Sequence, residues 1–485
     1  MKSRSIPFPA PFVAPFVAIA LLAGCASRDS KAANDAVAAQ AALDRGNIRL
    51  ARIQIQRALA VRDDISDYWM IQARISVAGK NLSGAYAAYQ NALQFDRANL
   101  EALASLCQIA LATNAATDAE KYADQLAAIN PGSTLPDTVR AAAAMARGDR
   151  NKANRYLDQV LAAQPGDPTA LIVRARMLAD AQDYAGATKA VEQSLNAPGD
   201  PTSRLAMLVG LYQRAHDRDG LMGALGRLAQ TNADDADIQL RYADLLFDDG
   251  KNDAANAAIA RAAAAKPNDI GISATALNLW LKQGPDAIPA SRLVADASGA
   301  SLAMKAAYAQ FANETGHPDL AIRILGGVAF DSAAMIRPDA AVAAAALAYA
   351  RGLTGDRAGA NALLAGVLQA DPDQPAALLA RGRLRGAAGD RRGAIEDLRN
   401  AVAQDGGNVA ARLALADLLL ANGDGVLAES ALHDGMSAAG DDPRLVARLA
   451  RLQIARGKRD AATAALADFV RANPLSRRAA RVRAG

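Results

Sequence analysis

Apolar and polar positions follow a helical period in short runs along almost the whole chain. Residues 375–408 show the pattern clearly, because their apolar positions fall on one face of each of two successive helices. These positions are Leu378, Leu379 and Leu384 in the first run and Ala394, Ile395, Leu398, Ala401 and Val402 in the second. Gly389 lies between the runs, where glycine can adopt the left-handed backbone conformation that ends a helix. Such a helix pair cannot bury its apolar face alone, so it must stack on neighbouring pairs.

A fixed spacing of 34 residues repeats this pattern. Glycines keep the spacing in two phases, each followed five residues later by an alanine, and a proline follows 17 residues later in several copies. The glycines are Gly46, Gly148, Gly250, Gly355, Gly389, Gly423 and Gly457; the alanines are Ala51, Ala153, Ala255, Ala360, Ala394, Ala428 and Ala462; the prolines are Pro165, Pro267, Pro372 and Pro474. A period of this length predicts a stack of small units in place of one globular core.

The pattern resembles the tetratricopeptide repeat (TPR), in which small residues, a turn-forming glycine, an alanine and a proline occupy fixed positions. The best copy, residues 66–99, has Trp69, Ala73, Ala85, Tyr89 and Ala92 at the expected places. The resemblance implies an all-α fold, a right-handed α-solenoid of about thirteen TPR-like helix pairs. The pairs start near Ala32, Ser66, Leu100, Thr134, Pro168, Thr202, Ala236, Ile270, Leu302, Ala341, Pro375, Val409 and Pro443.

The repeats diverge between residues 284 and 338. Pro289 stands where the signature alanine is expected and should break or shift a second helix. Roughly five extra residues precede the next good copy, near Pro338. We therefore expect an N-terminal block over residues 32–283, a degenerate segment or joint over 284–338, and a C-terminal block over 339–476. The alternative is that 284–338 is only a divergent repeat. A basic tail, residues 477–485, follows and is expected to be solvated or frayed; contact with anionic lipid or polysaccharide is the alternative.

The N-terminus has the features of an export signal. Lys2 and Arg4 precede an apolar stretch, residues 12–22, that is too short to span a bilayer. The segment ending in Gly24-Cys25 resembles the signal peptide of bacterial lipoproteins, which implies removal of residues 1–24, lipidation of Cys25 and a short tether over 25–31. Ala26, in place of an aspartate, favours the periplasmic leaflet of the outer membrane under that resemblance. An ordinary secretory signal with an incidental cysteine is the alternative.

Composition excludes several classes of function. The formal charge of +4 falls to about +2 without Lys2 and Arg4, which does not favour nucleic acid as a partner. His216, His317 and His433 are far apart and lack metal-ligand spacing, so neither an enzyme nor a cofactor or metal site is predicted. The acidic pairs Asp248-Asp249 and Asp441-Asp442 fit turns or helix caps. Cys107, at a small-residue position, should be buried and structural.

What remains is the surface of the solenoid. In tetratricopeptide solenoids the ninth residue of each repeat points into a concave groove. That row reads Gln40, Arg74, Gln108, Ala142, Arg176, Gly210, Asp244, Asn278, Gln310, Tyr349, Arg383, Asp417 and Arg451. We expect Arg74, Arg176, Tyr349, Arg383 and Arg451 to contact a protein or peptide partner. A solvated inner wall without a fixed ligand is the alternative.

Together these features predict a membrane-tethered periplasmic scaffold that binds a protein or peptide partner in an envelope assembly or export system. Repeat number alone slightly favours exopolysaccharide export. Two alternatives stay open: an adaptor or regulator of a cell-wall enzyme, and a glycan-binding solenoid. Tyr349 is the sole aromatic residue in the groove row, which disfavours stacking on sugar rings.

Overall fold

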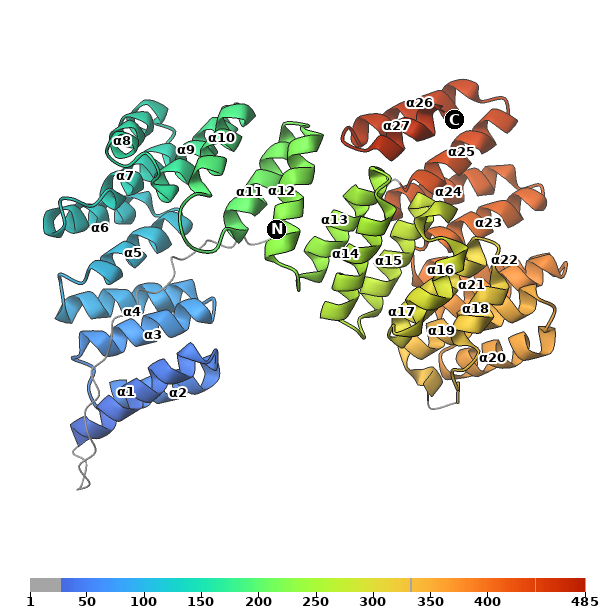
Figure 1. Cartoon of the computed structure of the whole chain (residues 1–485), viewed down its shortest axis with the longest axis horizontal. Helices are drawn as coiled ribbons and strands as arrows, with labels where there is room; N and C mark the ends of the chain where they lie inside the picture. Colours follow the sequence, from blue (N-terminus) through green and yellow to red (C-terminus); the bar gives the residue numbers. More distant parts are fainter. Residues whose placement is uncertain (1–27, 332–333, 441, 485) are drawn as a thin grey trace. The chain divides into compact units, whose positions relative to one another are not determined.

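The computed structural model describes residues 28–331, 334–440 and 442–484 (Figure 1). Cys25 and the predicted signal peptide lie outside this range. The described residues form 27 α-helices and two short 3-10 helices, with no strand among them. The predicted all-α repeat solenoid is therefore confirmed. The chain divides into two compact units, unit 1 up to Ala215 and unit 2 from His216.

Unit 1 consists of five helix pairs and one further helix. Its helices are α1 (Arg28–Asp44), α2 (Ile48–Leu59), α3 (Ser66–Ala78), α4 (Leu82–Phe95), α5 (Leu100–Ala112), α6 (Ala116–Ile129), α7 (Leu135–Ala146), α8 (Arg150–Ala163), α9 (Pro168–Asp180), α10 (Tyr184–Ser194) and α11 (Thr202–Arg214). Each helix packs on the next along the chain. Tyr89, Leu103, Leu106 and Tyr122 are among the buried side chains shared between pairs.

Unit 2 begins with one helix and continues with seven helix pairs and a terminal helix. Its helices are α12 (Arg218–Thr231), α13 (Ala236–Asp248), α14 (Asn252–Ala265), α15 (Ile270–Gln283), η1 (Pro285–Ala287), α16 (Ala290–Ser298), α17 (Leu302–Glu314), α18 (Pro318–Leu325), η2 (Ala334–Ile336), α19 (Pro338–Leu353), α20 (Arg357–Ala370), α21 (Pro375–Ala387), α22 (Arg391–Gln404), α23 (Val409–Ala421), α24 (Gly425–Ala439), α25 (Pro443–Ala455), α26 (Arg459–Ala472) and α27 (Arg477–Ala484).

Small residues allow the two helices of a pair to approach closely. All seven signature alanines predicted from the period are at most 1% exposed. At Gly382 of α21, a Cβ atom would lie 2.9 Å from Cγ of Leu398 in α22, which is too close for any larger residue without rearrangement. Cys107 is also fully buried, as predicted, and burial raises the pKa of its thiol to about 12. A neutral, inaccessible thiol of this kind fills space in the core.

The turn inside each pair places one residue in the left-handed backbone region at the same 34-residue spacing. The seven signature glycines all have positive φ, from 73° to 98°. In four other copies a residue with a side chain takes this conformation: Lys80, Asn114, Gln182 and His216. The period of the backbone therefore continues through copies whose sequence has lost the glycine. Such positions cost roughly 1–2 kcal/mol when the residue is not glycine, and packing of the pair must offset that cost.

The described residues of the divergent segment, 284–331 and 334–338, include the helices α16, α17 and α18 and belong to unit 2. Pro289 directly precedes α16, which starts late and is short, as the proline predicts. Trp280 stacks on Tyr308 with ring centroids 4.7 Å apart, and Leu293, Phe311 and other buried residues join the same core. The two compact units divide elsewhere, between Ala215 and His216, inside the expected repeat that starts at Thr202. That residues 284–338 act as a joint stays a prediction.

The C-terminal segment docks on the start of unit 2. Asp248, the last residue of α13, accepts hydrogen bonds from the backbone N–H groups of Arg477 (2.7 Å) and Arg478 (2.6 Å), about 230 residues away along the chain. The Arg478 side chain forms ion pairs with Asp244 and Asp248, and Arg218 forms ion pairs with Asp248 (2.9 Å) and Asp249 (2.6 Å). We call Arg218, Asp248, Asp249 and Arg478 the closing cluster. It joins the two ends of unit 2.

This finding corrects two sequence-based expectations. Asp248 was expected to act in a local turn or cap, but it caps α27 from a distant helix. Arg477 and Arg478 were expected to be part of a solvated tail, but Arg478 is nearly buried, with a side chain 12% exposed. Burial alone would raise the pKa of Asp248, but the N–H groups of Arg478 and Arg477 and the nearby guanidinium groups lower it. By contrast, Asp442 does cap its own helix, α25, as expected.

Asp248→Asn should lower the free energy of unfolding of unit 2 by about 3 kcal/mol, because two buried guanidinium groups lose their shared carboxylate. The chain has two tryptophans, Trp69 in unit 1 and Trp280 in unit 2. Urea titration followed by Trp280 fluorescence in a Trp69→Phe background isolates unit 2. Asp237→Asn, an exposed site on the same helix, is the matched control. Equal unfolding midpoints for the two variants would contradict the role of the cluster.

Candidate partner-binding site

A cavity of about 510 Å³ lies along the inner wall of unit 2. Its walls come from four successive first helices, α15, α17, α19 and α21, and from the start of α23. These helices contact one another in order, α15 with α17, α17 with α19 and α19 with α21. Consecutive first helices therefore form one continuous wall, and the volume is within the usual range of ligand sites, roughly 300–1,000 Å³.

Four residues of the predicted groove row line this cavity. They are Asn278, Gln310, Tyr349 and Arg383, one from each of the four helices. The 34-residue period places the ninth residue of each first helix on the same face, so stacking brings residues far apart in sequence together. The structure thus assembles this part of the row into one site. That the site holds a partner stays a prediction.

Most of the wall is apolar, and much of it is small. The side chains of this kind include Ala274, Leu277, Leu281, Ala303, Ala307, Val342, Ala345, Ala346, Ala376, Leu379, Ala380 and Val409. Alanines leave room where larger side chains would fill the space between the helices, which accounts for the cavity. Binding of an apolar ligand removes such a wall from water, which stabilises the complex by about 25 cal/mol per Å² of apolar surface buried.

Arg383 is already engaged by two neighbours inside the cavity. Its guanidinium forms an ion pair with Glu314 of α17, and its Cζ atom lies 5.4 Å from the centre of the Tyr349 ring. Burial would lower the pKa of Arg383, but the Glu314 carboxylate raises it, so the charge is retained. Burial also raises the pKa of Tyr349, which keeps its phenol neutral. The ion pair of Arg383 and Glu314 therefore adds polar groups to the wall but no net charge.

Carboxamide side chains supply several further polar groups of the cavity. Gln310 has no hydrogen-bond partner among the described residues, and Asn278 accepts one bond from Arg444 (3.2 Å). Asn313 donates to the carbonyl oxygen of Ala346 (3.0 Å), but its Oδ1 atom is buried and without a partner. An unpaired buried acceptor costs roughly 1–3 kcal/mol, and a donor from a ligand would recover it. Carboxamides can pair with peptide groups, since both carry one donor and one acceptor side.

Sequence reasoning missed Glu314 and Asn313. Both lie on α17, three and four residues after Gln310, and therefore on the same helix face as a residue that was predicted to line the groove. Extending the predicted row by three and four residues along each first helix would have found them. The partner of Glu314, Arg383, is 69 residues away, so no local pattern indicates the ion pair.

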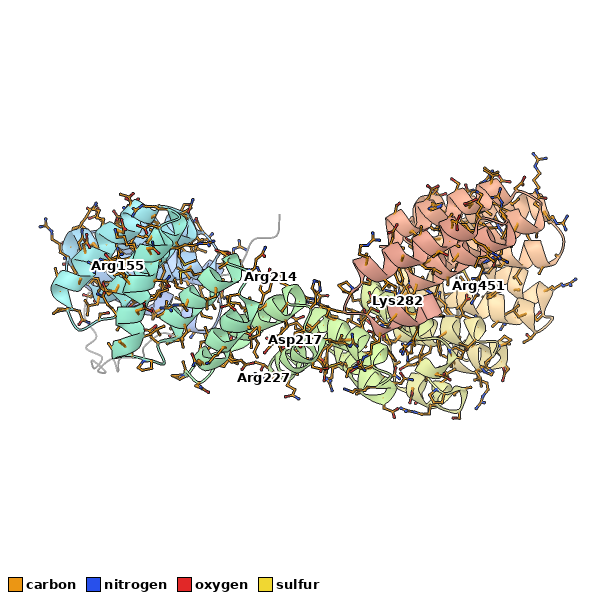
Figure 2. The ribbon with its side chains drawn as sticks, turned by 90° about the horizontal axis from the view of Figure 1, so that it is seen from above. Arg155, Arg214, Asp217, Arg227, Lys282 and Arg451 are labelled. Carbon is orange, nitrogen blue, oxygen red and sulfur yellow. The ribbon has the colours of Figure 1, made fainter. Side chains whose placement is uncertain are left out.

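The other predicted groove residues lie apart from this cavity. Arg451 of α25, labelled in Figure 2, is in unit 2 and exposed. It is not among the residues that line the cavity. Arg74 and Arg176 belong to unit 1. Arg74 pairs with Glu101 of the next first helix at 2.5 Å, and Arg176 is exposed. Cys25, the predicted lipidation site, lies outside the described residues.

In residues 28–331, 334–440 and 442–484 no group of three or more His, Cys, Asp or Glu side chains could hold a metal ion. Over the same part of the chain, no helix is both long enough and apolar enough to cross a membrane.

Models of the tetratricopeptide repeat match residues 37–99, 138–201 and 387–447. The matched segments have the features of tetratricopeptide repeats. They lie in both units, and their helix pairs share the spacing of the helices between them. Tetratricopeptide repeats typically form non-enzymatic scaffolds for contact between proteins. No curated protein sequence matches the chain.

Solved structures resemble parts of the chain. One comes from the functional characterization of Pseudomonas aeruginosa pilF; it is 17% identical, and the match covers 42% of this chain and 92% of that one, with a TM-score of 0.32. PilW, a widely conserved type IV pilus biogenesis factor, is 17% identical over 41% of this chain and 92% of its own, with a TM-score of 0.34. A tetratricopeptide repeat protein from Parabacteroides merdae is 14% identical over 41% and 78%, with a TM-score of 0.38. Such TM-scores indicate partial superposition only.

Proposed function

We propose that the chain is a lipid-anchored scaffold of the bacterial cell envelope, and that the unit 2 cavity holds a short, largely apolar segment of a partner protein. The observation that carries the proposal is the cavity itself, which combines small apolar walls with the unbonded carboxamide of Gln310 and the unpaired Oδ1 atom of Asn313. This combination suits a peptide, since side chains can occupy the apolar wall while peptide groups bond to Gln310 and Asn313.

The charges in the cavity favour a neutral or weakly basic segment. Arg383 is neutralised by Glu314, and Asp339 is paired with Arg337 at 2.7 Å, so Asp405 alone adds uncompensated negative charge to the lining. A free carboxylate would meet no available cation there and would have to give up its hydration. Arg383 lies over one face of the Tyr349 ring, so that face is not open for stacking on a sugar. Both facts support an internal protein segment over a carboxyl terminus or a glycan.

The proposed location rests on the N-terminal sequence. The short apolar stretch before Cys25 resembles a lipoprotein signal, which would fix the scaffold at a membrane. Attachment of multiple acyl chains gives stable anchoring, and tethering raises the local concentration of the cavity for any partner at that membrane. An envelope assembly or export system would use such an arrangement. Regulation of a cell-wall enzyme through a bound segment of that enzyme is compatible with the same cavity.

The cavity is tested by filling it. Ala274→Trp with Ala376→Trp places two indole rings into the site at positions that are not fully buried, so the fold should persist. A photo-crosslinking amino acid at Gln310 should capture one defined partner peptide in intact cells, and the filled variant should lose that adduct. The matched control is Ala257→Trp on α14, which is exposed and away from the cavity. Persistence of the same adduct in the filled variant would exclude the cavity as the site.

The anchor is tested separately at Cys25. Cys25→Ala should move the protein from the membrane fraction to the soluble periplasmic fraction and abolish incorporation of labelled palmitate, because no thiol remains to be acylated. Cys107→Ala is the matched control, since its buried thiol is the other cysteine of the chain. Retention of label in Cys25→Ala would contradict lipidation at this residue.

A further inference from the structure

The second helix of unit 1, α2, carries an outer face that is both basic and apolar. Ala51, Ile55 and Ala58 form its buried side. The opposite side is exposed and follows a helical spacing of three to four residues. We call this outer face the α2 patch; its exposed members are Arg49, Leu50, Arg52, Ile53 and Arg57, with Arg45 and Val61 beside it.

The arginines of the α2 patch have no carboxylate partner among the described residues. No aspartate or glutamate occurs between Arg45 and Arg62 in the sequence. Several other arginines of unit 1 pair with carboxylates, namely Arg74 with Glu101, Arg140 with Asp124, Arg147 with Glu120 and Arg174 with Asp158. The patch is therefore a local excess of positive charge on the first helix pair of unit 1.

Large apolar side chains are exposed among these arginines. Leu50 is 38% exposed, Ile53 is 41% exposed, and Val61 is 42% exposed. Single exposed apolar residues are common, but here they alternate with arginines on one helix face. A basic helix face with interspersed aliphatic side chains is typical of contact with a membrane surface.

We propose that the α2 patch binds the anionic phospholipid surface of a membrane. The guanidinium groups of Arg49, Arg52 and Arg57 would pair with lipid phosphates, and Leu50 and Ile53 would enter the boundary between headgroups and acyl chains. The patch lies in the first helix pair of unit 1, drawn in blue at its end in Figure 1. The inference rests on the proposed envelope location, because a membrane must be within reach of that pair.

The consequence is a second attachment point beside the proposed acyl anchor. An anchor alone leaves the first helix pair free to rotate above the membrane. Contact through α2 would lay this pair against the surface and set the direction in which unit 1 leaves the membrane. Electrostatic contact of this kind weakens with salt, since the Debye length falls to about 3 Å at 1 M.

The test uses the full chain with Cys25→Ala, so that no acyl chain contributes. Vesicles of phosphatidylcholine with phosphatidylglycerol are compared with vesicles of phosphatidylcholine alone in a sedimentation assay. The protein should prefer the anionic vesicles, and Arg49→Gln with Arg52→Gln and Arg57→Gln should lower the partition coefficient about 100-fold. Ile53→Ser should lower it about fivefold and leave its salt dependence unchanged.

A matched control keeps the same change in net charge. Arg391→Gln with Arg392→Gln and Arg399→Gln alters three exposed arginines on α22, a second helix of unit 2, where Glu396 lies among them. This variant should bind anionic vesicles within about twofold of the parent protein. Equal losses of vesicle binding in both triple variants would overturn the proposal. A parent protein that does not prefer anionic vesicles would also overturn it, and that result is expected if the ligand of the patch is an acidic protein. Because neither the cavity nor the anchor enters the assay, these outcomes are independent of the proposed function.

Discussion

The shape of unit 2 depends on the contacts that the carboxylate of Asp248 makes with the C-terminal helix. This carboxylate binds the first two N–H groups of α27 and two guanidinium groups, and so joins segments about 230 residues apart. A solenoid without such a closure is held only by contacts between neighbouring repeats, and its curvature can vary by small changes at each interface. The contacts of Asp248 join the two ends of unit 2 and thereby fix its total curvature. The four first helices that line the cavity are thereby held at one curvature, with Arg383 against Glu314.

Stacking of helix pairs supplies the remainder of the stability. Each pair is too small to bury its apolar surface, so alanine and glycine at the contacts allow neighbours to approach and share one core. Because alanine side chains are small, they also leave the cavity open where several of them line it. Small residues therefore serve both in the packing between repeats and in the wall of the proposed binding site. In unit 1 the candidate site is on an outer surface: the first helix pair presents the α2 patch, whose arginines have no carboxylate partner among the described residues.

The sequence predicted the local part of this structure and missed the distant part. The period located the helix pairs, the buried alanines such as Ala394, and the shared wall of Asn278, Gln310, Tyr349 and Arg383, because a helical repeat fixes spacing and facing. It could not indicate that Asp248 binds Arg478, since both residues also fit a local cap and a basic tail. The ion pair between Glu314 and Arg383 was missed for the same reason. Such contacts depend on total curvature, which is a sum over many interfaces and leaves no local pattern.

The most direct measurement of closure is a distance between the two ends of unit 2. Spin labels at Ala257→Cys on α14 and Ala464→Cys on α26, both exposed, report this distance by double electron–electron resonance in a chain that lacks its native thiols. We predict a single narrow distance distribution that becomes broad when Asp248→Ala is added, with helicity unchanged. A broad distribution in the parent chain, or a narrow one that Asp248→Ala leaves unaltered, would contradict closure by Asp248.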